Sequence, residues 1–183
     1  MVHLAPVTSE RGRDLRVTMG SSTGDFLGIN FRNLGTGDSY FTSTGTITST
    51  GHEGANILTS ILSNNLTARF NSVVANGTGI FVQAKGRGIA DIAATGLVSS
   101  ATGIGLVATT GSVASDTAVT GLNLRVADVS AQARAVLINY LGQGDVNFSS
   151  TGALTSRAET GLHVRTGSTS ANLDVQVNDV QAV

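Results

Sequence analysis

The chain contains no cysteine and no tryptophan, and it has one proline in 183 residues. Without cysteine it can form neither a disulfide framework nor a thiolate metal site. Charged residues make up 13% of the chain, which is about half the share found in most soluble domains. A chain with so few acids and bases has little material for general acid–base chemistry. We therefore expect that the protein is not an enzyme.

Charge and hydropathy exclude two further classes of partner. The formal net charge is −1, so no excess of positive charge attracts the chain to nucleic acid or to an anionic membrane. No run of about 18 apolar residues is present, and we expect no membrane insertion of this segment. The first residues, MVHLAPVTSERGRDL, lack the apolar region of a signal peptide, so a secreted protein would carry its signal ahead of this sequence.

Glycine is abundant, and it recurs in a phrase of the form Gly-apolar-x-apolar. The phrase starts at Gly28, Gly54, Gly79, Gly103 and Gly161, with a variant that has alanine at Ala135. Successive starts are 26, 25, 24, 32 and 26 residues apart. A fixed period of roughly 20 to 50 residues is typical of solenoids and other repeat architectures.

Two further patterns keep step with the glycine phrase. One is a small residue, a variable residue and then an apolar residue, as in Gly45-x-Ile47, Ser72-x-Val74, Gly96-x-Val98, Ala127-x-Val129, Gly152-x-Leu154 and Asn178-x-Val180. The other is an alternating run, as in Leu66-x-Ala68-x-Phe70, Leu122-x-Leu124-x-Val126, Val146-x-Phe148 and Leu173-x-Val175-x-Val177. The segment DLRVTM at 14–19 resembles this run once more, so residues 1–27 are predicted to form an N-terminal partial coil or cap.

Each cycle thus offers three short strands of period two, joined by Gly, Asn, Ser and Thr corners. Three strands per roughly 25 residues correspond to one turn of a parallel β-helix, and residues 28–183 are predicted to form about six to seven such coils. The glycine at each corner is explained either by a positive φ or by close packing, since both favour a residue without a Cβ atom. Like residues should stack, giving the predicted rows Ile29, Ala55, Ile80, Ile104, Val136, Leu162 and Phe31, Ile57, Val82, Leu106, Ile138, Val164.

Two other folds compete with this interpretation. The segments 55–74 and 124–141 also place their apolar residues on one helical face. A β-sandwich is the second rival, although it would usually show more aromatic residues and no fixed period. The constant phase of the flanking cycles favours strands.

The long fourth cycle predicts an insertion of about six to eight residues near 109–120. Parity also predicts an apolar strip on the outside of the helix, made by Phe81, Val107 and Leu137 on successive coils. Other outward positions carry polar residues such as Asn30, Asn56 and His163. The strip is therefore a candidate contact surface, either for the inserted loop or for a second molecule.

Other candidates for chemistry are weaker. His3, His52 and His163 have no His or carboxylate at ligand spacing, so no metal site is expected. Lys85, Arg87 and Asp91 are close in sequence, and we interpret them as a corner loop. The glycine pairs do not extend to GxGxxG, so no phosphate-binding cofactor is expected. Thr44, Thr95 and Thr151 align in a row that Asn71 and Ala127 interrupt, which argues against an ice-binding threonine array.

The cycle TGIFVQAKGRGIADIAATGLVSSATGIGLVA resembles the passenger domains of Gram-negative autotransporters, and the resemblance extends over about residues 28–183. It implies a right-handed parallel β-helix that is exported to the bacterial cell surface. It also implies adhesion to a host surface or glycan, or self-association, without catalysis. The alternatives are a polysaccharide-active β-helical enzyme and a ligand-binding module whose insertion at 109–120 carries the site.

Overall fold

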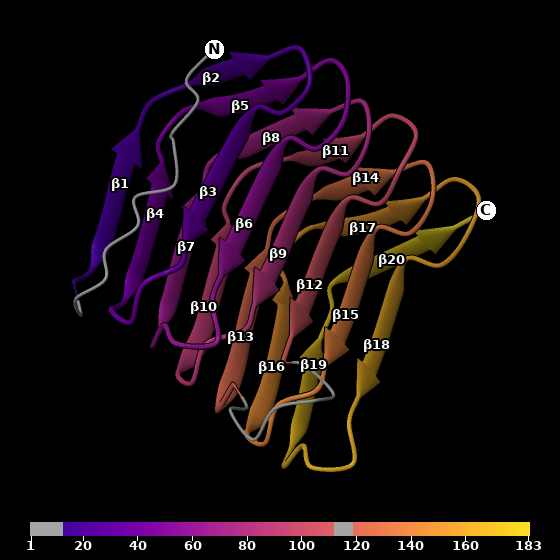
Figure 1. Cartoon of the computed structure of the whole chain (residues 1–183). Coiled ribbons are helices and arrows are strands. Elements are labelled where there is room, and N and C mark those ends of the chain that lie inside the picture. Colours follow the sequence, from indigo (N-terminus) through magenta and orange to yellow (C-terminus); the bar gives the residue numbers. More distant parts are fainter. Residues whose placement is uncertain (1–12, 112–118) are drawn as a thin grey trace.

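The computed structural model describes residues 13–111 and 119–183. Within that part the chain is entirely β, with twenty short strands and no helix. Every pairing between the described strands is parallel. Each inner strand pairs with the strands three places before and after it along the chain, and the strands at the ends of each sheet have one partner. The protein is therefore a parallel β-helix, as the sequence period predicts, and Figure 1 shows its coils stacked along one axis.

Three parallel sheets run the length of the helix. Sheet A contains β3 (Ile29–Asn33), β6 (Ala55–Thr59), β9 (Ile80–Ala84), β12 (Leu106–Thr110), β15 (Val136–Tyr140) and β18 (Leu162–Thr166). Sheet B contains β1 (Leu15–Met19), β4 (Ser39–Ser43), β7 (Leu66–Phe70), β10 (Ile89–Ala94), β13 (Gly121–Val126), β16 (Asp145–Ser150) and β19 (Leu173–Gln176). Sheet C contains β2 (Ser22–Gly24), β5 (Thr46–Ser49), β8 (Ser72–Ala75), β11 (Val98–Ser100), β14 (Val129–Ala131), β17 (Ala153–Ser156) and β20 (Asp179–Ala182).

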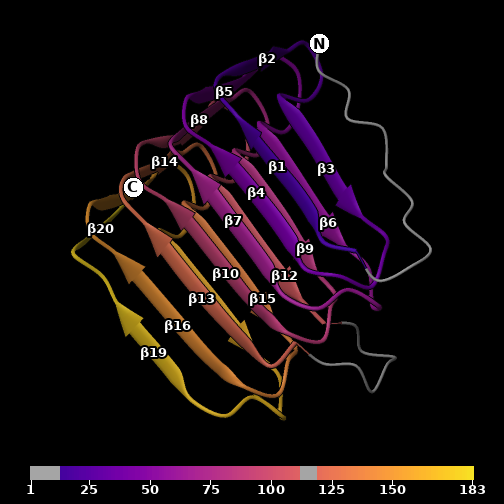
Figure 2. The same cartoon turned by 90° about the vertical axis from the view of Figure 1, so that its left-hand side faces the viewer.

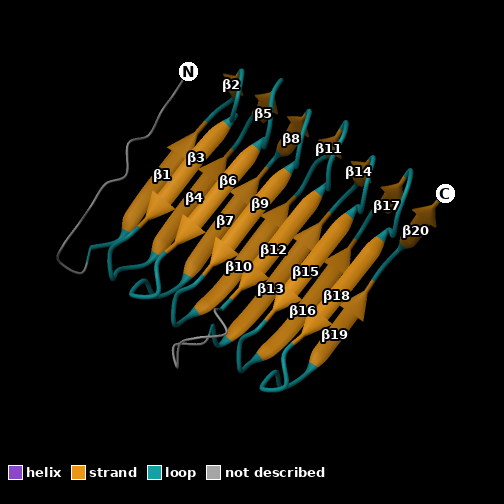
Figure 3. Cartoon of the chain, turned by 45° about the vertical axis from the view of Figure 1, so that its right-hand side comes forward, coloured by secondary structure: helices purple, strands orange, loops and turns teal. Residues whose placement is uncertain are grey.

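One coil consists of a sheet B strand, a sheet C strand and a sheet A strand, in that order. The described chain makes six such coils, and β19 and β20 begin another. The strands of sheets A and B run in opposite directions, and the short strands of sheet C lie across one end of these two sheets (Figures 1 and 3). Figure 2 shows the strands of sheet B from the side, in the order of the coils.

Strict alternation fills the space between the sheets. In β9, Ile80 and Val82 are fully buried, whereas Phe81 and Gln83 are partly exposed on the outside. Most other strands repeat this alternation, which is the pattern of a half-buried strand. The helical interpretation of 55–74 and 124–141 is wrong, since those segments form β6 to β8 and β13 to β15.

The glycines that precede sheet A are required by close packing. A Cβ atom on Gly54, Gly79 or Gly105 would lie 2.3 to 2.8 Å from a γ-carbon of Val73, Val98 or Val129 in the next coil. None of these glycines has a positive φ, and Gly111 is the one residue with a positive φ in the described chain. Of the two reasons that the sequence left open, close packing is therefore the one that holds at these corners.

Both predicted rows are wrong in the fourth coil. Leu106, and not Ile104, pairs with Ile80, so that Ala108 instead of Leu106 pairs with Val82. The segment Gly103–Ala108 contains two overlapping matches to the glycine phrase, which start at Gly103 and at Gly105. A shift by two residues keeps the same side chains inside, so parity cannot distinguish the two registers.

The inward residue of β8 also differs from the prediction, which places Val74 inside. In the structure Val73 is buried and pairs with Val98, while Val74 is 41% exposed. The two valines are adjacent, so hydrophobicity alone leaves the parity open. A shift by one residue exchanges the inner and outer faces of a strand.

The connection between β12 and β13 runs from residue 111 to 120, whereas the equivalent connections at 85–88 and 141–144 have four residues each. The longest of these three connections thus falls within the predicted insertion at 109–120. Residues 112–118 of that insertion lie outside the described part of the chain, as do residues 1–12 of the predicted N-terminal cap. The remainder of that cap, as far as it is described, contains β1 and β2 of the first coil.

Candidate functional site

The predicted apolar strip is one continuous row on the outer face of sheet A. Phe81 pairs with Val107, and Val107 pairs with Leu137, on the adjacent strands β9, β12 and β15. These strands lie side by side in Figure 3. Neighbouring strands are about 4.8 Å apart, so the strip extends over roughly 10 Å along the helix axis. Val107 in the middle is only 7% exposed, while Phe81 and Leu137 are partly exposed.

The strip has polar neighbours in its own row. Asn56 pairs with Phe81 at one end, and His163 pairs with Leu137 at the other. The second outward row of the same strands contains Gln83 and Asn139 on β9 and β15. An apolar row bordered by polar side chains is the form that a small protein contact site takes.

Sheet B presents a different outer face, which is polar along nearly its whole length. This face carries a triplet in which the Asp91 carboxylate lies between two guanidinium groups. One Asp91 oxygen accepts a hydrogen bond from Arg69, and the other accepts one from Arg125 at 2.6 Å. Arg69 also donates to the backbone carbonyl of Asp91 at 2.8 Å. These residues come from three consecutive coils, through β7, β10 and β13.

The sequence predicts that Asp91 lies with Lys85 and Arg87 in a corner loop, and for Asp91 this is wrong. Lys85 and Arg87 occupy the corner between β9 and β10, whereas Asp91 lies within β10. Its partners are 22 and 34 residues away in the chain. An alignment of the repeats could have placed Asp91 correctly. Asp91 takes the same outward position of the coil as Thr67 and Asn123, which are strand residues.

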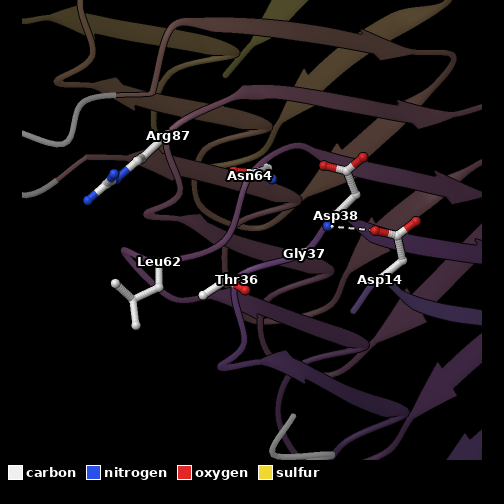
Figure 4. A pocket seen from close by; sticks show the side chains of 7 residues that line it. All are labelled: Asp14, Thr36, Gly37, Asp38, Leu62, Asn64 and Arg87. Carbon is white, nitrogen blue, oxygen red and sulfur yellow. Dashed lines mark hydrogen bonds between the residues drawn. The ribbon is translucent and has the colours of Figure 1, made fainter. Parts of the chain in front are cut away.

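A hollow of about 470 Å³ lies at the corner between sheets A and B in the first coils (Figure 4). Its lining includes two carboxylates, Asp14 and Asp38, together with Asn64 and Arg87. Figure 4 shows the two aspartates at one side of the hollow and the Arg87 side chain at the other. Paired carboxylates could serve as a cation site or as an acid–base pair, so their hydrogen bonds decide what they can do.

All four carboxylate oxygens of this pair already accept hydrogen bonds or an ion pair. Asp14 accepts from the backbone N–H of Asp38 and from Arg16, both at 3.1 Å. Asp38 accepts from the backbone N–H and the side-chain amide of Asn65 at 3.1 Å, and from the Tyr40 hydroxyl at 3.0 Å. Burial alone would raise the pKa of Asp38, but the hydrogen bonds from Asn65 and Tyr40 lower it. A general acid needs the opposite shift. The hydrogen bonds from Asp38 to Asp14 and from Asn65 to Asp38 connect successive coils.

The other sequence candidates do not come together. His52 packs against Phe26, with ring centroids 4.2 Å apart, and His163 is exposed on the outer face of β18. His3 lies outside the described residues. Among the residues that the structure describes, no group of three or more His, Cys, Asp or Glu side chains could hold a metal ion.

The threonine row is interrupted as the sequence predicts. The backbone N–H of Asn71 bonds to Ser43, that of Ala127 to Ala94 and that of Thr151 to Val126, which places Asn71 and Ala127 between the threonines.

The coil begun by β19 and β20 exposes residues whose counterparts are buried elsewhere. Leu173 is 50% exposed, while its partner Val146 in the preceding coil is fully buried. Val175, Val177 and Val180 are likewise exposed by 38 to 44%. This coil end is a second apolar surface, separate from the strip on sheet A.

Searches with the whole chain found no matching family model, no similar curated protein and no similar solved structure. Within residues 13–111 and 119–183, no helix is long and apolar enough to cross a membrane.

Proposed function

We propose that the chain is a non-catalytic, surface-exposed β-helical segment of an autotransporter-type adhesin, located at the bacterial cell surface. Its role is adhesion to a host surface or glycan, or self-association. The proposal is supported by the repeat style of the sequence and by the regular β-helix, which offers long side faces for contact. The observation that carries it is the strip Phe81, Val107 and Leu137, which is apolar in a row whose flanking positions are polar.

Contact with a second molecule would remove the partly exposed Phe81 and Leu137 from water. Burial of apolar surface stabilises such a contact by about 25 cal/mol for each Å². Val107 is only 7% exposed, so the two flanking residues contribute most of the area that association can bury. They are therefore the residues to change.

The test compares two double variants of the same strands. Phe81→Ser with Leu137→Ser removes the strip, and Gln83→Ser with Asn139→Ser changes the next outward row of β9 and β15 as the matched control. Light scattering over a range of concentrations measures the mass of each protein. We expect the wild type and the control to associate and the strip variant to be monomeric.

Two results would contradict self-association through the strip. A monomeric wild type would exclude self-association of this chain. An unchanged oligomer in the strip variant would mean that the interface lies elsewhere. The exposed coil end is the competing surface in that second case, because an open strand edge can pair with another chain. Val175→Lys would then reduce the mass, whereas the strip variant would not.

The enzymatic alternative is tested with the same preparation. A polysaccharide-active enzyme would release new reducing ends from an acidic or neutral polysaccharide during incubation. Such release, if lost in a variant of the described carboxylates, would replace the non-catalytic proposal.

A further inference from the structure

The outer face of sheet B carries a guanidinium group that is fixed in position and still accessible. The Asp91 carboxylate binds both Arg69 and Arg125, so the triplet has one more positive than negative charge. The Arg125 side chain is 52% exposed, compared with 33% for Arg69. A guanidinium group has five donors, and the contact with Asp91 leaves others directed to solvent. Arg125 is therefore oriented by one partner and able to bind another.

Two hollows adjoin Arg125 on this face. The first, of about 250 Å³, has small side chains on its floor and rim, contributed by Ala93, Thr95, Ala127, Ser149 and Thr151. The second, of about 190 Å³, is bordered by Asn147, Asp174 and Gln176. Arg125 and Ser149 line both of them. The two hollows extend from β10 to β19, which is roughly 14 Å at the usual spacing of strands.

The shape of the first hollow has a simple origin. Ala93 occupies the outward position between Arg69 and Arg125 in the neighbouring strands, and Ser149 follows Arg125 in the same row. A row of long, short, long and short side chains leaves a depression beside each long one. The lining of this hollow is mostly apolar, and Arg125 is its one charged residue.

These surroundings match the chemistry of a sugar chain. A sugar ring has an apolar C–H face that can lie on small apolar side chains, and it has hydroxyl groups at its edge for amides and carboxylates. A carboxylate on the sugar would pair with the guanidinium fork of Arg125. We propose that the outer face of sheet B binds an oligosaccharide that contains an acidic sugar, with its carboxylate at Arg125 in the first hollow.

The lining of the second hollow indicates which kind of sugar would lie next to the acidic one. Asp174 there would repel a second carboxylate, whereas Asn147 and Gln176 can bond to hydroxyl or acetamido groups. The ligand class is therefore an acidic sugar linked to a neutral one. This inference names a glycan partner for the proposed adhesin, and it rests on that function only for its biological meaning.

The experiment uses a defined probe, a tetrasaccharide of alternating glucuronic acid and N-acetylglucosamine. Its methyl ester, in which the carboxylates are neutral, is the chemical control. Titration by NMR with the full chain gives a dissociation constant for each probe. We expect the wild type to bind the acid about tenfold more tightly than the ester, and Arg125→Gln to bind the two within about twofold.

Three further variants sharpen the test. Arg125→Lys keeps the charge without the planar fork and should give an intermediate preference for the acid. Ser149→Tyr places a large side chain between the hollows and should abolish binding of both probes. Arg165→Gln, on the outer face of β18 in sheet A, is the matched loss of charge and should bind like the wild type. Urea midpoints within error of the wild type show that each variant is folded.

The proposal is overturned if the wild type does not bind the acid at millimolar concentration. It is also overturned if wild type and Arg125→Gln show the same preference for the acid. The outcome is independent of self-association. Phe81→Ser with Leu137→Ser should bind the tetrasaccharide normally, and Arg125→Gln should associate normally.

Discussion

Gly79→Ala replaces one hydrogen atom by a methyl group, and we expect this small change to destabilise the β-helix strongly. The added Cβ would lie 2.4 Å from the carbonyl oxygen of Gly105 and 2.8 Å from Cγ1 of Val98. Both distances are far below ordinary van der Waals contact. The carbonyl of Gly105 cannot retreat freely, because it accepts the hydrogen bond from the backbone N–H of Ile80 at 2.9 Å.

The size of the effect follows from two opposing contributions. Forcing an extra carbon atom into a packed interior costs about 1 to 3 kcal/mol in the free energy of unfolding. Replacing glycine by alanine also restricts the unfolded chain, which stabilises the folded state by about 0.4 to 1 kcal/mol. The clash involves backbone as well as side chain, so we expect a net loss at the upper part of the range, about 2 kcal/mol.

Gly121→Ala is the matched control, because Gly121, the first residue of β13, is also buried and also lacks a positive φ. A Cβ there would meet its nearest neighbours at 3.6 Å, which is ordinary contact. We expect this variant to lie within about 0.5 kcal/mol of the wild type or to be slightly more stable. Urea unfolding followed by far-UV circular dichroism gives both values.

Val98→Ala serves as a second background for the same change. It removes the contact with Cγ1 and leaves the carbonyl oxygen of Gly105 in place, so Gly79→Ala should remain costly there. If Gly79→Ala and Gly121→Ala have equal effects, close packing is not the reason for glycine at the sheet A corner.

Three further predictions concern single side chains. Val82→Asp should cost several kcal/mol in urea unfolding because it buries an unpaired carboxylate, whereas the outward Gln83→Asp should cost under about 0.5 kcal/mol; equal effects would mean that the strand parity of β9 is wrong. Tyr140→Phe removes the hydroxyl that donates to the Val119 carbonyl at 3.0 Å and accepts from the Gly144 N–H at 2.9 Å, and it should cost about 1 to 3 kcal/mol by the same assay; no loss would show that water replaces the hydroxyl. The lowered pKa of Asp38 means that its ionised form stabilises the fold at pH values above the ordinary carboxyl pKa of 3.8, and this stabilisation is lost as the pH falls through the lowered pKa. The thermal unfolding temperature of the wild type should therefore exceed that of Asp38→Asn by less at acidic pH, and a difference that grows on acidification would contradict this argument.

Residues that recur at the same place in every cycle could be interpreted without a structure. The three alternating runs predict three strands per coil, because period-two alternation suits a strand buried on one side only. The glycine phrase predicts the corner before sheet A. Parity alone also shows that Phe81, Val107 and Leu137 face outward, but the predicted rows put Gly105 opposite Phe81, and only the structure places Val107 there.

Two segments fit the repeat pattern in two ways, and in both of them only contacts between coils decide which register or which inward residue is adopted. Gly105 is chosen over Gly103 because it packs under Val129 and its carbonyl bonds to Ile80. Val73 is chosen over Val74 by its pairing with Val98. Both choices depend on residues about 25 positions away, which local hydrophobicity does not reveal.

The triplet of Arg69, Asp91 and Arg125 likewise depends on contacts between coils and not on a local pattern. The sequence by itself determined that the chain forms a β-helix, because the repeat dictates strands, corners and inward faces. The tertiary structure decided the register between coils, and with it the neighbours of every outward side chain. A coil can shift by two residues and still bury the same kind of residue, so only the close packing of whole coils fixes which charges meet on the surface.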